Sequence, residues 1–281
     1  MKKIIFVIMA ITALLESQAL MGQGTPGNAK EYNERGVQYF QNEQFEQAIA
    51  DFSQSIRMDS NDPVSYRNRA FTYLITGEFD RAITDYSQAI RMDPDFAQAY
   101  NNRGYAYFRK EDFPKAISDY SQAIKISPNL SEAYENRAYA YQESGDLNSA
   151  ISDFSQVIKF EPKKAGKYIQ RGRAYLVSGD FDKAIADYNQ AIKLDKKSIE
   201  AYVRRGEAYA NQDNYKKAIA DLNQAVKLAP KSDSILFIRG FLYYLNKDYK
   251  KAITDSEAAL KINPDLAEAR NLINACREVM R

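Results

Sequence analysis

The sequence contains no histidine, no tryptophan and a single cysteine, Cys276. Histidine is the commonest general base and metal ligand, so its absence argues against a metal centre and against nucleophile–histidine catalysis. One cysteine cannot form a disulfide within the chain or a cysteine-based zinc site. The chain also lacks a surplus of either charge, because 39 basic and 37 acidic residues leave a net charge of +2, which argues against nucleic-acid binding. We therefore expect no enzyme activity, cofactor, metal, nucleic-acid partner or small-molecule substrate.

Residues 1–22 differ in composition from the rest of the chain. Lys2 and Lys3 precede an uncharged apolar run over residues 4–15, which ends at Glu16. A helix of that length spans about 18 Å, which is shorter than a bilayer core of about 30 Å. This pattern predicts a secretory signal peptide over residues 1–22 and a leader over 23–28, and hence a periplasmic or secreted protein. An uncleaved N-terminal membrane tether is the alternative, and it would be the chain's only contact with a membrane.

After this segment, an arginine followed by glycine or alanine recurs every 34 residues without a gap. Seven units result, covering residues 29–62, 63–96, 97–130, 131–164, 165–198, 199–232 and 233–266. In the third unit, Tyr100, Gly104 and Tyr107 have the spacing of one helical face, and Ala116 and Tyr120 begin a second such stripe. Each unit is therefore predicted to form two helices joined by a turn.

Three further columns repeat in register with the arginines. The small residues are Gly36, Ala70, Gly104, Ala138, Gly172, Gly206 and Gly240. The aromatic residues one turn later are Tyr39, Tyr73, Tyr107, Tyr141, Tyr175, Tyr209 and Tyr243. The alanines of the second helix are Ala48, Ala82, Ala116, Ala150, Ala184, Ala218 and Ala252. A small residue lets two helix backbones approach closely, and a ring fills the space above it.

This pattern resembles the tetratricopeptide repeat family over residues 29–266. The resemblance implies an all-α fold, namely a right-handed superhelical α-solenoid of seven 34-residue helix-turn-helix repeats. Residues 267–281 are predicted to form a C-terminal capping helix with Cys276 buried, because Ala269, Ile273 and Cys276 share one apolar face.

Two charged columns accompany the repeat, and one of them departs from the family, which usually has leucine where this chain has arginine. The arginines are Arg35, Arg69, Arg103, Arg137, Arg171, Arg205 and Arg239. The aspartates are Asp51, Asp85, Asp119, Asp153, Asp187, Asp221 and Asp255. Each aspartate lies 16 residues after one arginine and 18 before the next. We predict a structural ladder of Arg–Asp pairs, across the hairpin or across the joint between units. The alternative is an anion-binding stripe.

The resemblance also implies that the first helices line a concave groove in which a protein or peptide partner lies. Helical geometry assigns partner-binding side chains to that face. These are Asn68, Asn102, Asn136, Arg67, Asn101, Tyr105, Tyr139, Phe237, Phe241 and Leu245. The asparagines are predicted either to hold a peptide backbone or to be solvated or capping amides. The apolar residues near the C-terminus are predicted either to dock an amphipathic helix or a second copy, or to pack on the capping helix.

We therefore predict an exported, non-catalytic interaction module that binds a protein or peptide partner in the bacterial cell envelope. The alternative is a self-associating structural scaffold for an envelope assembly, which would make the chain a homo-oligomer.

Overall fold

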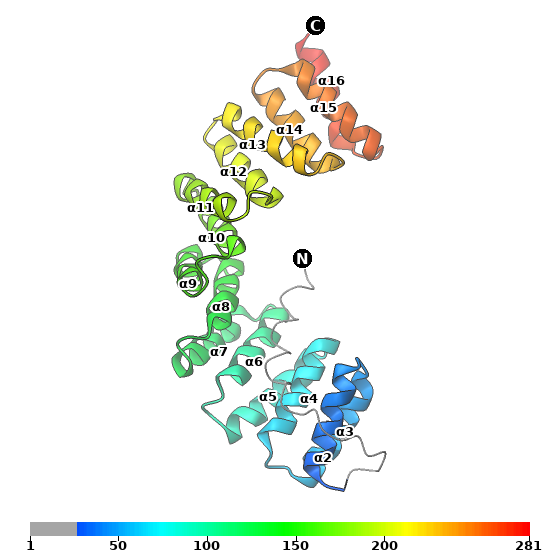
Figure 1. Ribbon diagram of the computed structural model, residues 1–281, viewed down its shortest axis with the longest axis vertical. Helices are drawn as coiled ribbons and strands as arrows, with labels where there is room; N and C mark the ends of the chain where they lie inside the picture. The colour runs from blue at the N-terminus through cyan, green and yellow to red at the C-terminus, as the bar shows by residue number, and fades with distance from the viewer. Residues whose placement is uncertain (1–26) are drawn as a thin grey trace. The chain divides into compact units, whose positions relative to one another are not determined.

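The computed structural model describes residues 27–281, and all regular secondary structure in this part of the chain is helical. It comprises fifteen helices, labelled α2 to α16 in Figure 1. The predicted signal peptide over 1–22 and most of the leader over 23–28 lie outside the described residues. The chain divides into two compact units, of which unit 1 ends at Pro128 and unit 2 runs from Asn129 to Arg281.

Unit 1 consists of three helical hairpins. Its helices are α2 (Ala29–Gln41), α3 (Phe45–Met58), α4 (Pro63–Thr76), α5 (Phe79–Met92), α6 (Ala97–Arg109) and α7 (Phe113–Ile126). Each first helix packs most extensively on the second helix of its own repeat, while α3 packs on α4 and α5 packs on α6. Successive first helices also touch, so the hairpins stack in chain order (Figure 1).

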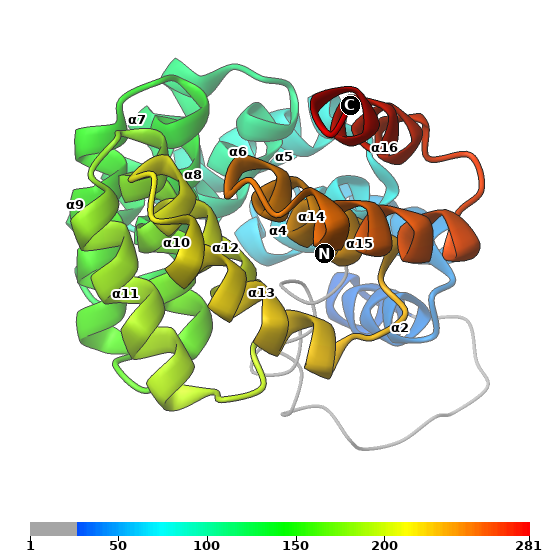
Figure 2. The ribbon, with the colours of Figure 1, turned by 90° about the horizontal axis from the view of Figure 1, so that it is seen from above.

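Unit 2 consists of four hairpins and a final helix. Its helices are α8 (Ser131–Glu143), α9 (Leu147–Phe160), α10 (Ala165–Val177), α11 (Phe181–Leu194), α12 (Ile199–Asn211), α13 (Tyr215–Leu228), α14 (Asp233–Leu245), α15 (Tyr249–Ile262) and α16 (Ala267–Val279). Helix α16 packs on α15 and α14, and the three lie side by side in Figure 2. It buries Ala269, Leu272, Ile273 and Cys276, which is the arrangement predicted for a capping helix.

A left-handed backbone residue lies in the turn between the two helices of every repeat. Seven residues spaced 34 apart have φ between 56° and 89°. They are Glu43, Gly77, Glu111, Gly145, Gly179, Asp213 and Lys247. This conformation reverses the chain direction within three residues, and only glycine adopts it without steric cost. The turn geometry is thus common to all repeats, while only three of them have the residue that best suits it.

The column of small residues allows the close helix contact expected from the sequence. A Cβ atom added to Gly104 would lie 2.9 Å from Cε1 of Tyr120 and 3.2 Å from the Ala116 carbonyl oxygen. At Gly36 it would lie 2.7 Å from the ring of Phe52. The ring of the second helix therefore occupies the space that a side chain of the first helix would need.

Candidate functional site

The arginine column forms the predicted ladder, and the pairing is across each hairpin. Each of the seven arginines donates two hydrogen bonds, from Nε and Nη2, to the carboxylate 16 residues later, at 2.5–2.9 Å. The aspartates are buried. At Arg103 the hydrogen bonds to Asp119 raise the guanidinium pKa above its ordinary value. The arginines are thus occupied by carboxylates, which removes the basis for an anion-binding stripe.

The arginine ladder also links one repeat to the one before it, through Arg69, Arg103, Arg171, Arg205 and Arg239. Their Nη1 groups donate to a serine or asparagine on the preceding second helix at 2.6–3.0 Å. The acceptors are Ser53, Ser87, Ser155, Asn189 and Asn223. Sequence reasoning missed this contact, although the signal was present as a serine or asparagine 16 positions before every ladder arginine from Arg69 onward. The charged ladder therefore holds repeats together as well as hairpins.

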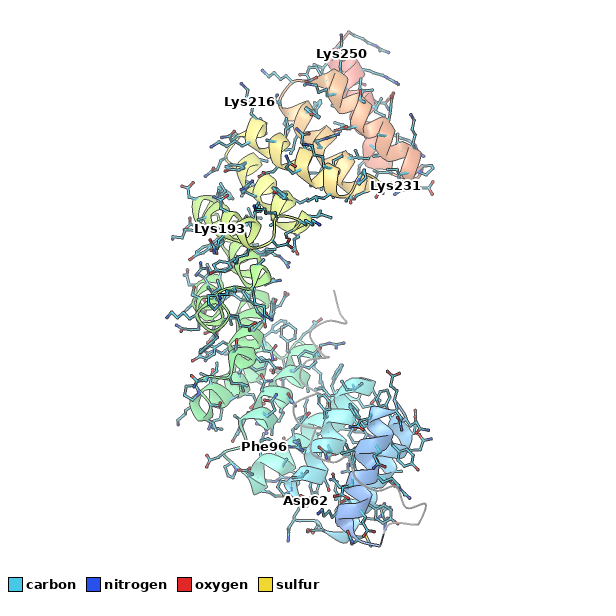
Figure 3. All side chains as sticks on the ribbon, viewed as in Figure 1. Asp62, Phe96, Lys193, Lys216, Lys231 and Lys250 are labelled. Atoms are coloured by element: carbon cyan, nitrogen blue, oxygen red, sulfur yellow. The ribbon has the colours of Figure 1, made fainter. Side chains whose placement is uncertain are left out.

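The first helices of unit 1 carry a connected set of polar side chains. Asn68 donates from Nδ2 to Oδ1 of Asn33 at 3.0 Å, and Arg67 donates from Nε and Nη2 to Oδ1 of Asn68 at 3.2 and 3.1 Å. The Arg67 guanidinium lies 5.5 Å from the centre of the Phe96 ring, which is labelled in Figure 3. Arg67 forms no ion pair with any residue in the described range, and burial lowers its pKa. It is therefore a partly buried cation without a carboxylate, unlike the ladder arginines.

The structure corrects the expectation that Asn101 and Asn102 present their amides to a partner. Their side chains are only 1% and 7% exposed. Asn102 donates from Nδ2 to the hydroxyl oxygen of Tyr86 at 3.1 Å, and Tyr86 is fully buried in α5. Asn102 thus satisfies a buried hydroxyl and belongs to the packing between α5 and α6.

The other predicted polar and aromatic positions are half-buried. Asn68, Asn136, Tyr105 and Tyr139 all fall in this class. Tyr105 accepts a hydrogen bond from Nη1 of Arg109 at 3.2 Å. These side chains retain some solvent contact, which a partner-binding residue requires.

The apolar cluster near the C-terminus is partly packed and partly exposed. Phe237 packs against the buried group formed by Ala252, Leu272 and Cys276, so the expectation of packing on the capping helix is correct for this residue. Leu245 is partly buried against the core around α13. Phe241 is 44% exposed, and its ring stacks on the half-buried Tyr244 ring with centroids 6.4 Å apart.

Ile238, one turn before Phe241 on α14, is 38% exposed. Most other exposed apolar side chains have a different setting, because they recur at the last residue of a second helix. These are Met58, Phe160, Leu194, Leu228 and Ile262. They are a periodic feature of the repeat, whereas Ile238 and Phe241 are adjacent on one face in the middle of a first helix. We call this pair the α14 patch.

Residues 27–281 contain neither a candidate membrane span nor a candidate metal site. No helix there combines the length and apolar character of a membrane span. No cluster of three or more histidine, cysteine, aspartate or glutamate side chains within the same range is suited to a metal ion.

Family models for the tetratricopeptide repeat match most of the chain. A model described as TPR repeat matches residues 72–111 and 172–213. Models described as tetratricopeptide repeat match residues 97–130 and 199–232, residues 120–152, and residues 29–62 and 233–266. A search of curated proteins returned no match.

Several solved structures share the fold. The C-terminal part of a TPR repeat-containing protein from Cytophaga hutchinsonii superposes with a TM-score of 0.75 at 20% identity, covering 85% of this chain and 98% of that one. A tetratricopeptide repeat protein from Parabacteroides merdae gives a TM-score of 0.63 at 17% identity, covering 89% and 98%. YrrB, described as a TPR protein with an unusual peptide-binding site, gives 0.58 at 21% identity, covering 66% and 95%.

The unbroken 34-residue period, the helical hairpins, the family models and these structures agree. The chain is a tetratricopeptide repeat protein, with the fold of an interaction module.

Proposed function

We propose that the chain is a non-catalytic module that binds a peptide or helix of another protein on the exposed face of its first helices. The α14 patch lies on this face in unit 2, and the unpaired Arg67 lies on it in unit 1. The residues proposed to contact a partner are Arg67, Asn68 and Tyr105 in unit 1, and Asn136, Tyr139, Phe241 and Leu245 in unit 2.

The observation that carries the proposal is the exposure of the α14 patch. Phe241 and Ile238 are 44% and 38% exposed although they adjoin one another and follow Phe237, which is partly buried against the core. Neighbouring large apolar side chains on a free surface lose the stabilisation that burial provides, about 25 cal/mol for each Å². Such a pair is a typical feature of a protein–protein contact, and aromatic residues dominate the energetics of such contacts.

Two further points support the proposal. Arg67 keeps donor capacity beyond its two bonds to Asn68, and a peptide offers carbonyl and carboxylate oxygens that accept from a guanidinium. YrrB, which has the same fold, is described as having a peptide-binding site.

Site-specific photo-crosslinking in the native host tests the proposal. Benzoylphenylalanine replaces Phe241 in one variant and Leu194 in a control variant, whose side chain is 37% exposed at the end of a second helix. We expect a crosslinked adduct with another protein at position 241 and none at position 194. Equal labelling at both positions contradicts the proposal, and an adduct of two copies of this chain favours the self-associating scaffold instead.

We also propose that residues 1–22 direct the chain to the periplasm or the cell exterior. The basic start and the short apolar run over residues 4–15 support this location. Mass spectrometry of the N-terminus after cell fractionation provides the test. A chain that begins within or directly after this segment, recovered from the periplasm or the medium, supports export. A chain that retains residues 1–22 in the cytoplasm contradicts it.

A further inference from the structure

The guanidinium of Arg67, on α4 in unit 1, is half-buried and is held by neutral groups. It donates from Nε and Nη2 to Oδ1 of Asn68, and it lies 5.5 Å from the centre of the Phe96 ring. Asn68 is itself fixed by its bond to Asn33 on α2 at 3.0 Å. The Arg67 side chain is therefore held in place, while its positive charge and its Nη1 group have no partner among residues 27–281.

The acidic residue at the start of the same helix does not neutralise this charge. Asp62 caps α4, and its carboxylate accepts bonds from the backbone N–H groups of Val64 and Ser65 and from the Ser65 hydroxyl, at 2.6–3.1 Å. By contrast, the ladder residue Arg69 on the same helix donates two bonds to the Asp85 carboxylate. A partly buried cation without an acid is unfavourable, and a carboxylate from outside would relieve this.

A second arginine without a carboxylate, Arg109, lies on the corresponding face of α6. Arg67 corresponds to Asn101 in the 34-residue period, and Tyr105 and Arg109 follow at intervals of four residues, which places them on one helical face. The Arg109 guanidinium lies 4.9 Å from the centre of the Phe79 ring and donates from Nη1 to the Tyr105 hydroxyl at 3.2 Å. Like Arg67, it is held by neutral groups and forms no ion pair with the residues that the structure describes.

The two helices that carry these arginines contain no acidic residue. The 14 residues of α4 and the 13 residues of α6 include four arginines and neither aspartate nor glutamate. Two of the arginines are ladder residues, which aspartates of the second helices neutralise. Nearby acids are engaged elsewhere: Glu34 on α2 pairs with Lys30, and Asp80 on α5 pairs with Lys110. The first-helix face of α4 and α6 therefore carries two positive charges without counter-charges.

We propose that this face binds an acidic segment of the partner, with one side-chain carboxylate on Arg67 and another on Arg109. This inference rests on the proposed function, because it names the chemistry of the partner at unit 1. Helix α6 begins directly after Phe96, on which Arg67 lies, and ends at Arg109, so about 18 Å of helix separates the two ends. A single terminal carboxylate cannot reach both, so the segment must supply several acidic side chains.

Three synthetic peptides serve as probes in ligand-observed NMR titrations of the full chain. The acidic probe is acetyl-Glu-Ser-Glu-Phe-Glu-Ser-Glu-amide, and the neutral probe has glutamine in place of each glutamate. The third probe is the neutral sequence with a free C-terminal acid, which separates a terminal carboxylate from acidic side chains. We expect the acidic probe to bind at least about tenfold more tightly than either of the others.

Arg67→Gln is expected to weaken binding of the acidic probe about tenfold, and Arg109→Gln about threefold because its side chain is exposed. Arg91→Gln is the matched control, since it removes the same charge from the second helix of the repeat that contains Arg67. Arg91 is exposed and bonds to the neutral Gln88, and its loss is expected to leave the affinity unchanged. Arg67→Gln should leave the melting temperature nearly unchanged, whereas Arg69→Gln, which breaks a ladder pair, should lower it.

Equal affinity for the acidic and neutral probes overturns the inference, and so does an unchanged affinity in Arg67→Gln. An equal loss of affinity in Arg91→Gln overturns it as well, because binding would then follow net charge and not this face. A fall in melting temperature in Arg67→Gln as large as that in Arg69→Gln would assign Arg67 to packing and overturn it too.

The failure of this inference is distinguishable from the failure of the proposed function. Photo-crosslinking at position 241 reports on α14 in unit 2, whereas the peptide titrations report on α4 and α6 in unit 1. If crosslinking captures a partner while the acidic probe shows no preference, the proposed function stands and only the acidic segment is refuted.

Discussion

Removing the arginine of a ladder pair is predicted to destabilise the protein more than removing both members of the pair. Arg103 and Asp119 provide the test, because their side chains are only 19% and 9% exposed and two hydrogen bonds of 2.8 and 2.7 Å join them. Arg103→Met leaves the Asp119 carboxylate buried without a counter-charge, and we expect a loss of about 3 kcal/mol. Asp119→Leu leaves the more exposed guanidinium, which keeps its bond to Ser87, and we expect about 2 kcal/mol.

The double variant is expected to lose about 2 kcal/mol, because no uncompensated charge remains. The coupling energy between the two sites is then about 3 kcal/mol, at the upper end for residues in direct contact. Because repeat arrays often unfold one part at a time, hydrogen exchange followed by mass spectrometry is the appropriate assay. A loss of 3 kcal/mol corresponds to exchange about 150-fold faster in α6 and α7.

The pH dependence of this effect also follows from the structure. The pKa of Arg103 is raised in the folded protein, chiefly by its hydrogen bond to Asp119. A raised pKa of a cation gives stability that is complete below the ordinary pKa of arginine and is lost only above it. The loss of unfolding free energy caused by Arg103→Met is thus expected to be constant from neutral pH to pH 10.

If the free-energy losses of Arg103→Met and Asp119→Leu add up in the double variant, the two residues do not act as a pair, and the prediction is refuted.

Three further predictions concern packing, the turn and alkaline pH. Gly104→Ala is expected to lower the free energy of unfolding by about 1.5 kcal/mol, because its Cβ would meet a buried ring at 2.9 Å. Gly166→Ala, which has open space around it, is expected to raise the free energy of unfolding by up to about 1 kcal/mol. Thermal melts that show equal effects for the two variants would contradict this account. Lys247→Gly, at φ 62°, is expected to raise the free energy of unfolding by about 0.5 kcal/mol, and a decrease would show that the turn is not strained. Burial raises the pKa of Tyr86 and Tyr188 above the ordinary 10.0, so the stability that these hydroxyls contribute is complete below pH 10 and falls above it. Absorbance at 295 nm should therefore show tyrosines that ionise only when the protein unfolds. Ionisation of all tyrosines near pH 10 in the folded protein would contradict this prediction.

The fold could be predicted from the sequence because the 34-residue period has no gap. A fixed period places each residue type in the same surroundings seven times, so one hairpin predicts all. The pairing of Arg103 with Asp119 was less certain from spacing alone. A separation of 16 residues fits a hairpin and one of 18 fits a joint, and only the helix packing shows that the guanidinium fork reaches across the hairpin.

The error at Asn102 has a different cause. Helical periodicity gives the direction of a side chain from its helix axis but not the depth at which a neighbouring helix meets it. Tyr86 comes from α5, and its hydroxyl reaches the Asn102 amide at 3.1 Å. The sequence signal was the tyrosine 16 residues before the asparagine, a separation that also links the ladder arginines to Ser87 and its counterparts.

Variation among the seven repeats distinguishes the columns that packing determines from those that it leaves free. The arginine column is identical in every repeat because each member meets the same buried aspartate. Two positions later on the same helices lies a column that is nowhere buried and changes from apolar to charged to aromatic. Its members are Val37, Phe71, Tyr105, Tyr139, Arg173, Glu207 and Phe241. If neighbours within the chain determined this column, the repeated surroundings would favour one residue type, as they do for arginine. The variation therefore shows that packing within the repeat does not determine the residue type in this column, so these positions are free to carry the partner contacts that we propose.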